Sequence, residues 1–306
     1  MHESQAPATV HTSRGDTVAV WRDRTTLQIG LDDDVLVLGP LPRRADRLVR
    51  SLTHPESSRR AHDPEDGEWR DWLRARLDEH GHLAAPRRSA TVRLLGTGSL
   101  AARVGSLLLD LGHRVVVSDP AHRPEVPSAA ERLVRHLRCS PGGRGRRAAT
   151  DTGVRAALTI VCTGTCEPDR SLTDALTREA HPYLVLRTRP GTAVAGPLVV
   201  PGTTSCLRCS DLWRAEADPV WPRLAAQLAH RPGPDDPVLD TWITGVALAQ
   251  VSAFLNGEAG ELRSRTLTLA GDTGRTTLRS WPAHPRCTCH HADVSALLPQ
   301  ADRMGP

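Results

Sequence analysis

The sequence predicts an α/β protein: a Rossmann-like domain with a mostly parallel sheet, locked by a structural zinc and preceded by a small winged-helix-like domain. Predicted strands and helices alternate between residues 90 and 200, which is typical of parallel sheets. A glycine-rich turn joins the first of these strands to its helix. Two close pairs of cysteines, separated by about 80 residues, indicate one shared metal site.

Length and composition limit the class of protein. The 306 residues are enough for one sizeable core and a smaller appended domain. No uninterrupted apolar run approaches the roughly 20 residues needed to cross a bilayer, and residues 1–12 do not resemble a signal peptide. We therefore expect a cytoplasmic protein without a membrane partner. The net charge of +4 is modest and spread among acidic residues, so we also expect no nucleic-acid partner.

The basic residues are all of one kind. The chain contains 39 arginines and no lysine. No lysine can therefore clamp a phosphate or form a Schiff base.

The N-terminal part predicts a separate small domain over residues 17–84. Three short strands are expected around residues 18–20, 27–31 and 35–38, followed by helices over 41–52 and 68–80. Three strands followed by helices within about 80 residues suggest a winged-helix-like module.

The second predicted domain covers residues 90–291, and residues 292–306 are expected to form a flexible tail. Strands are expected at residues 91–95, 114–119, 156–162, 183–187 and 194–200, with helices at 99–111, 131–137 and 169–180. Residues 141–153 are interpreted as a loop. A long apolar helix at 238–255 and a hairpin of residues 262–269 and 276–281 complete the domain.

The glycine-rich turn is a candidate nucleotide site. Gly96 and Gly98 stand between a strand and a helix, and Asp119 ends the next strand. In a nucleotide site such glycines let backbone amides approach phosphate, and the acid holds the ribose. Alternatively, the glycines only permit close packing of strand and helix.

The paired cysteines are the stronger signal. The sequences Cys206-Leu207-Arg208-Cys209 and Cys287-Thr288-Cys289 bring four thiols within reach of one tetrahedral ion. His290 or His291 could replace one thiolate, although four sulfurs are the simplest set. A site with four protein ligands has no open position, so its role would be structural.

The other three cysteines have no convincing metal partner. These are Cys139, Cys162 and Cys166, of which Cys162 ends a buried strand and is interpreted as a core residue. Cys166, in the loop that follows, is the only candidate thiol nucleophile. No catalytic residue is assigned.

These motifs resemble the ThiF/ubiquitin-activating-enzyme superfamily over roughly residues 90–290. The likeness rests on the glycine-rich turn, Asp119, the run from Gly196 to Cys209, and the ending Trp281 to Cys289, which looks like the "HPxCxC" of actinobacterial ThiF-like and azole cyclodehydratase partner proteins. The N-terminal part is similar to the winged-helix peptide clamp that grips leader peptides in such proteins.

The resemblance implies zinc at Cys206, Cys209, Cys287 and Cys289, and an ATP and magnesium site, real or vestigial, at Gly96, Gly98 and Asp119. Active members add an Asn-Leu-x-Arg-Gln segment after the ribose acid, a lysine on the triphosphate and an acidic residue for magnesium. Here the segment is absent, no lysine exists, and residues 163–166 carry no acid. Asp169 and Arg170 could restore part of the magnesium site.

Three functions remain open from the sequence. The first is a scaffold without adenylation activity in ribosomal-peptide modification, which binds a leader or partner peptide and docks a partner enzyme. The second is an adenylyltransferase that activates the C-terminal carboxylate of a peptide or small protein, with Arg103, Arg123 or Arg170 in place of the missing groups. The third is a nicotinamide- or flavin-dependent enzyme. Relatives often form dimers, so the resemblance also allows a homodimer.

Overall fold

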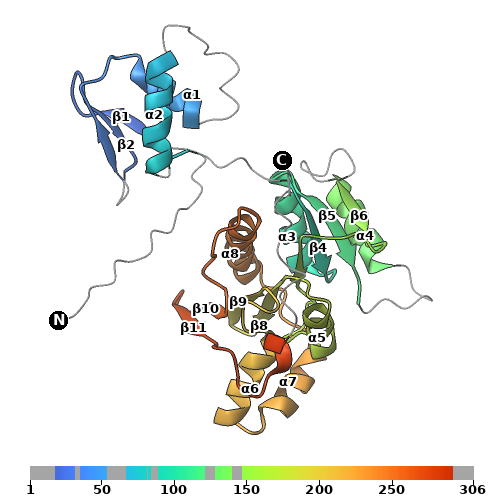
Figure 1. Ribbon diagram of the computed structural model, residues 1–306. Coiled ribbons are helices and arrows are strands. Elements are labelled where there is room, and N and C mark those ends of the chain that lie inside the picture. The colour runs from blue at the N-terminus through green and yellow to red at the C-terminus, as the bar shows by residue number, and fades with distance from the viewer. Residues whose placement is uncertain are drawn as a thin grey trace, which may run out of the picture. The chain divides into compact units, whose positions relative to one another are not determined.

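The computed structural model of the chain describes residues 18–31, 35–53, 67–80, 82–83, 89–120, 128–139 and 147–291. The chain divides into two compact units, Met1–Arg88 and Ser89–Pro306, each described here by itself (Figure 1). Residues 1–17, residues 54–66 of the polar stretch that follows Thr53, and the predicted tail at residues 292–306 lie outside the described residues.

The first unit is a three-stranded antiparallel sheet covered by two helices. The strands lie in the order β1 (Ala19–Trp21), β2 (Leu27–Ile29), β3 (Leu36–Leu38), and the helices are α1 (Ala45–Thr53) and α2 (Gly67–Glu79). Alternate strand residues face the helices because the side-chain period of a strand is two. The buried core therefore takes every second strand residue and one stripe of each helix: Leu27, Ile29, Leu36, Leu38, Ala45, Leu48, Val49, Leu73 and Leu77. The winged-helix assignment stays a prediction, since this arrangement is not specific for that fold.

The second unit contains an eight-stranded mixed sheet in the order β11-β10-β9-β8-β7-β4-β5-β6. The five strands from β8 to β6 in this order are parallel, and the β8–β9, β9–β10 and β10–β11 pairs are antiparallel. The strands are β4 (Thr91–Leu95), β5 (Arg114–Ser118), β6 (Ala148–Thr150), β7 (Leu158–Val161), β8 (Tyr183–Arg189), β9 (Thr192–Val199), β10 (Arg265–Ala270) and β11 (Thr276–Ser280).

Helices cover both faces of this sheet (Figure 1). One face packs against α3 (Ser99–Asp110), α4 (Ala129–Cys139) and α8 (Pro237–Leu255). The opposite face packs against α5 (Arg170–Arg178) and α6 (Leu207–Ala217), and α7 (Trp221–Ala229) lies against α6. Strand β8 serves both layers, because Leu184 and Leu186 face α8 whereas Tyr183 and Val185 face α5 and α6.

Helix α8 is the one described helix that is long and apolar enough to cross a membrane. Four of its residues, Leu239, Ile243, Ala247 and Val251, are at most 1% exposed and belong to the core cluster under the sheet. The α/β architecture, with α8 packed against β9, β8 and α3, is consistent with a soluble protein.

The sequence prediction is wrong at two places in this unit. Residues 148–150, expected in a loop, form β6 and pair with β5. The segment after Cys206, for which no helix was expected, forms α6 and α7. Proline at the start of α7 is compatible with a helix, because the first turn needs no backbone donor there.

The turn between β4 and α3 brings two backbone segments unusually close. Gly96 has φ +139°, and a Cβ atom at this position would overlap the carbonyl oxygen of Cys162 at the end of β7. Gly98 differs, because its φ is −77° and no atom lies within 4 Å of a Cβ placed there. The structural need for glycine is therefore at Gly96 and not at Gly98.

We expect Gly96→Ala to lower the free energy of unfolding by about 2 kcal/mol or more, because alanine would meet both a strained φ and the Cys162 carbonyl. Gly98→Ala, the matched control, should cost less than about 1 kcal/mol. Urea unfolding followed by circular dichroism measures both. Equal effects of the two substitutions would contradict this account of the turn.

Candidate metal centre and the glycine-rich turn

Four buried cysteines form a compact cluster. The Sγ atoms of Cys206, Cys209, Cys287 and Cys289 all lie within 4.8 Å of one another. The Sγ–Sγ distances are 3.9 Å for Cys206 to Cys209, 3.6 Å for Cys206 to Cys287 and 3.4 Å for Cys209 to Cys289. Four sulfurs at about 2.3 Å from a tetrahedral zinc would stand about 3.8 Å apart. The cluster therefore fits a metal ion such as zinc.

The electrostatics of the cluster also suit a cation. Hydrogen bonds from the thiols of Cys206 and Cys289 hold the pKa of Cys209 far below its usual range. Hydrogen bonds to Cys209 and Cys289, together with burial, raise the pKa of Cys206, so the thiolate, which is the form that binds metal, is favoured at Cys209 rather than at Cys206. Because the four thiols are buried together, a cation shared by them would remove the repulsion between neighbouring thiolates.

Two distant segments supply these four ligands. Cys206 caps the N-terminus of α6 and Cys209 lies in its first turn, whereas Cys289 lies in a short 3₁₀ turn (Thr288–His291) next to Cys287. Figure 1 shows this C-terminal turn beside α6. The side chains of His290 and His291, the alternative ligands, lie outside the described part of the chain.

Hydrogen bonds outside the cluster hold the two segments together. The indole Nε1 of Trp213 donates to the carbonyl of Pro282 at 2.8 Å, and the hydroxyl of Ser205 donates to the carbonyl of Trp281 at 2.6 Å. The ring of His284 is buried and lies 3.0 Å from the Glu216 carboxylate of α6. These contacts place the Cys287–Cys289 segment against α6 and support the ligands.

The remaining cysteines lie away from the cluster. Cys139 is exposed on α4, and Cys162 is fully buried, with its pKa raised to about 12 by burial. Cys166 is 1% exposed, and its thiol lies 3.5 Å from the carbonyl of Pro232. Its burial argues against the candidate role of Cys166 as a nucleophile.

The structure brings the three candidate nucleotide residues to one edge of the sheet. Gly96 and Gly98 follow β4, and Asp119 follows β5, whose last residue accepts a hydrogen bond from the backbone of Gly96. This edge, at the carboxyl ends of the parallel strands, is where α/β proteins bind ligands.

A carboxylate that was not predicted from the sequence lies at the N-terminus of α3. Asp240 of α8 is 1% exposed, and its Oδ2 accepts a hydrogen bond of 2.9 Å from the hydroxyl of Ser99. Its Oδ1 has no hydrogen-bond partner among the described residues. A negative charge next to a helix N-terminus interacts favourably with the helix dipole. Asp240 thus already places an acidic side chain, whose pKa is raised by burial, at the terminus that would otherwise attract phosphate.

The backbone of the loop after β7 is hydrogen-bonded to the backbone of a later segment of the chain. Gly233 donates to the carbonyl of Gly164, Cys166 donates to that of Arg231, and Glu167 donates to that of Leu228. The loop therefore pairs with residues 228–233 through its backbone. The absent magnesium carboxylate at residues 163–166 is not replaced by a nearby acid of this loop, since Glu167 faces arginines instead.

The residues expected to substitute for missing groups have other contacts. The side chain of Asp169 accepts a hydrogen bond from the backbone of Ser171 and caps α5. Arg170 contacts Glu167 and Asp211. Arg103 is exposed on α3, and Arg123 lies outside the described residues.

We expect Cys209→Ser to abolish stoichiometric zinc binding and to lower the free energy of unfolding by about 3 kcal/mol or more, because a tetrahedral site loses one of four thiolates. Cys139→Ser, an exposed cysteine outside the cluster, is the control and should keep the metal. Elemental analysis and thermal unfolding of the purified proteins measure both effects. Wild-type protein without metal, or full zinc content in the Cys209 variant, would refute the assignment.

No protein-family model and no curated protein matches the chain. Among solved structures, it is similar to Microcin C7 biosynthetic enzyme MccB in complex with N-formylated MccA, with a TM-score of 0.57 and 14% identity over 90% of this chain and 97% of that chain. E. coli MccB with ATP gives a TM-score of 0.56 and 12% identity over 90% of this chain and 97% of that chain.

A heterocyclase in complex with substrate and cofactor is also similar, with a TM-score of 0.58 and 14% identity. That match covers 90% of this chain but 38% of the heterocyclase chain. At such identities the likeness concerns the fold alone. The expected Rossmann-like α/β fold is thereby confirmed, whereas the ThiF superfamily and the particular subtype stay predictions.

Proposed function

We propose that the chain is a ThiF-like scaffold that binds a leader or partner peptide through its first unit, carries a structural zinc in its second unit and docks a modifying enzyme without adenylating a substrate. The observation that carries the peptide-binding part is a short antiparallel sheet with unpaired edges and an apolar outer face. The setting that we propose is cytoplasmic ribosomal-peptide modification.

The first unit offers an edge for an added strand. β1 and β3 are the outer strands of the three, and no described strand pairs with their outer sides. Such an edge presents free backbone donors and acceptors, which an extended peptide satisfies when it adds as a further strand. We call the exposed side chains of Val18, Val20, Val35 and Val37 the valine face. An added strand would extend the sheet next to this face.

The valine face is exposed on the side of the sheet away from the helices. Its four side chains are 37–45% exposed, and Val20 and Val37 both stand opposite Gln28 in the strand register. Exposed valines clustered on one face are unusual for a surface that only meets water. They give an added peptide apolar contacts besides its backbone hydrogen bonds.

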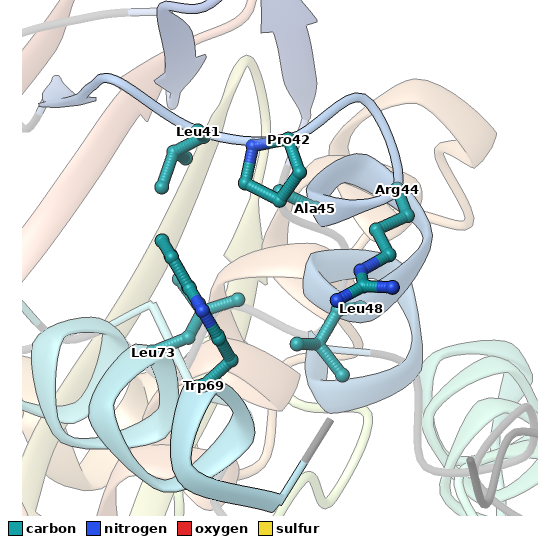
Figure 2. A pocket seen from close by; sticks show the side chains of 7 residues that line it. All are labelled: Leu41, Pro42, Arg44, Ala45, Leu48, Trp69 and Leu73. Carbon is teal, nitrogen blue, oxygen red and sulfur yellow. The ribbon is translucent and has the colours of Figure 1, made fainter. Parts of the chain in front are cut away.

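A small hollow in the same unit, with room for about one water molecule, lies on the helix side of the sheet. It holds about 10 Å³ and lies between the start of α1 and helix α2. Figure 2 shows Trp69 and Leu73 of α2 opposite Leu41, Pro42 and Leu48. Trp69 is 38% exposed, so its ring is accessible as a wall for an apolar side chain.

The molecules bound in the similar solved structures support this proposal. MccB was solved with N-formylated MccA, and the heterocyclase with its substrate and cofactor. The matched share of 90% extends beyond the second unit of this chain into the first. A role in handling a peptide substrate is the function most consistent with that likeness.

The absence of adenylation rests on the charges near the glycine-rich turn. Phosphoryl and adenylyl chemistry needs cations and Mg²⁺ at the phosphates. The chain has no lysine, the loop after β7 is paired through its backbone, and Asp240 places a carboxylate at the α3 terminus. Each of these features disfavours a bound triphosphate.

The alternative function is an ATP-dependent adenylyltransferase that activates a C-terminal carboxylate. The specific observation in its favour is the fold shared with E. coli MccB, which was solved with ATP. Under this alternative, Asp119 would hold the ribose. A homodimer, as in many ThiF relatives, is compatible with both functions.

We expect random-peptide phage display on the immobilised chain to select peptides that bind the first unit. Val37→Glu should then raise the dissociation constant of a selected, synthesised peptide at least about tenfold, because a charge would replace an apolar contact beside the strand edge. Leu278→Glu, an exposed apolar strand residue in the second unit, is the matched control and should bind as wild type. Calorimetry measures both affinities. A failure to select any peptide, or equal affinity of the Val37 variant, would count against the proposal.

We also expect no ATP–pyrophosphate exchange above the buffer blank when purified wild-type chain, a selected peptide, ATP and Mg²⁺ are combined. The physical reason is that too few cations converge on the phosphates. A second sample without Mg²⁺ gives the background of the assay. Exchange that depends on Mg²⁺ and on the peptide would establish the adenylyltransferase alternative.

A further inference from the structure

A cleft of about 340 Å³ is bordered by α6, α7 and the start of α5 in the second unit. The apolar part of its wall comes from α6 and α7, and the lining residues of α7 recur at the spacing i, i+3, i+4 and i+7, so they lie on one face of that helix. These apolar residues are Leu212, Ala215, Pro222, Ala225, Ala226 and Ala229. Pockets that receive drug-sized ligands hold roughly 300–1,000 Å³, so the cleft has room for several apolar side chains.

The charged end of the cleft carries groups of both signs. Asp169 and Asp211 stand beside Arg170 and Arg208 there. Asp211 accepts hydrogen bonds from Arg170, and Asp169 caps α5. Two acids thus balance two arginines, and this end does not select an ion of either sign. The distinguishing feature of the cleft is its apolar wall, in which short alanine side chains leave the space open.

Helix α7 has little apolar cover for its composition. Of its nine residues only Arg223 is charged, yet only Ala225 is buried. The helix packs mainly against α6. Helices in globular proteins are stabilised chiefly by burial of an apolar face. The cleft therefore leaves apolar surface of both α6 and α7 uncovered by the part of the chain that the structure describes.

The described chain ends close to this cleft. The Sγ atom of Cys289 lies 3.4 Å from that of Cys209, which is next in sequence to the lining residue Arg208. The described residues end two positions after Cys289, at His291. The lining face of α6 is about 10 Å long at a rise of 1.5 Å per residue. Residues 292–298 would span about 10 Å as a helix and about 23 Å when extended, so they can reach the whole face.

The sequence that follows carries apolar side chains at a suitable spacing. Residues 292–298 read Ala-Asp-Val-Ser-Ala-Leu-Leu, which places Val294, Leu297 and Leu298 at i, i+3 and i+4. In a helical turn these three side chains share one face. Pro299 comes next, and no such group recurs in residues 300–306. The apolar group thus lies within reach of the apolar wall.

We infer that the cleft between α6 and α7 is the docking surface for residues 292–298 of the same chain. Val294, Leu297 and Leu298 fill the space that the alanines leave and cover the apolar wall. The short connection to the cysteine cluster keeps the segment at a high effective concentration, so modest apolar contacts suffice. The start of the predicted tail thereby becomes part of the packing of the second unit. This contact does not depend on peptide binding by the first unit.

Hydrogen–deuterium exchange of the full chain, read by mass spectrometry of peptic fragments, tests the contact. Leu297→Asp combined with Leu298→Asp should speed exchange of the amides in residues 221–230 at least about tenfold, because charges replace two apolar contacts that hold α7. Exchange in α4 should not change. Gln300→Asp, which adds a charge beyond Pro299, is the matched control and should exchange as wild type.

Photochemical cross-linking identifies which chain supplies the segment. With benzoylphenylalanine in place of Leu297, irradiation should join this position to α6 or α7 of the same chain. Ala226→Glu places a charge on the apolar wall at an exposed position and should lower the yield severalfold. Gln227→Glu, exposed on the same helix but outside the lining, is the control and should keep the yield.

Three results would overturn the inference. The first is unchanged exchange of residues 221–230 in the double variant, or an increase that α4 shares. The second is cross-links that avoid α6 and α7 or that are insensitive to Ala226→Glu. The third is cross-links between two chains, seen as a dimer on a denaturing gel, because the occupant of the cleft would then belong to a second copy.

Discussion

The four-cysteine cluster is the constraint on which the architecture of the second unit depends. It joins the start of α6 to a segment 80 residues further along the chain. Between these ligands lie α7, α8 and the two strands that extend the sheet beyond β9. A metal bound by the four thiolates only in the folded form would hold both ends of this stretch together and add its binding free energy to stability.

The sequence predicted those structural features whose signal lies in residues close together in the chain. The cysteine pairs are two and three positions apart, the glycines of the turn are adjacent to a strand end, and the apolar strands have clear lengths, so sheet, turn and cluster were all expected. Helix α7 was missed because Trp221-Pro222 reads as a break, although proline suits the first turn of a helix. β6 was missed because Ala148-Ala149-Thr150 has weak strand propensity, and only pairing with β5 makes it a strand.

The polar residues inside the second unit could not be predicted for a different reason. Arg187 lies in a run of apolar strand residues and Asp240 in an apolar helix, and nothing next to them in sequence indicates a partner. Their partners come from other elements: Glu167 follows β7, and Ser99 begins α3. Whether a charged residue within an apolar run is buried depends on tertiary contacts of this kind, which periodicity does not encode.

Asp240 and Arg187 are buried charged residues of opposite kinds at two places in the second unit. At β4 the helix terminus that would receive phosphate faces the carboxylate of Asp240, whose pKa is raised by burial. At β8 the excess is positive, with Arg187 and its neighbours outnumbering the carboxylates. The charged side chains at the two places thus differ in kind: one buried acid lies at the α3 terminus, whereas four guanidinium groups surround two carboxylates beside β8.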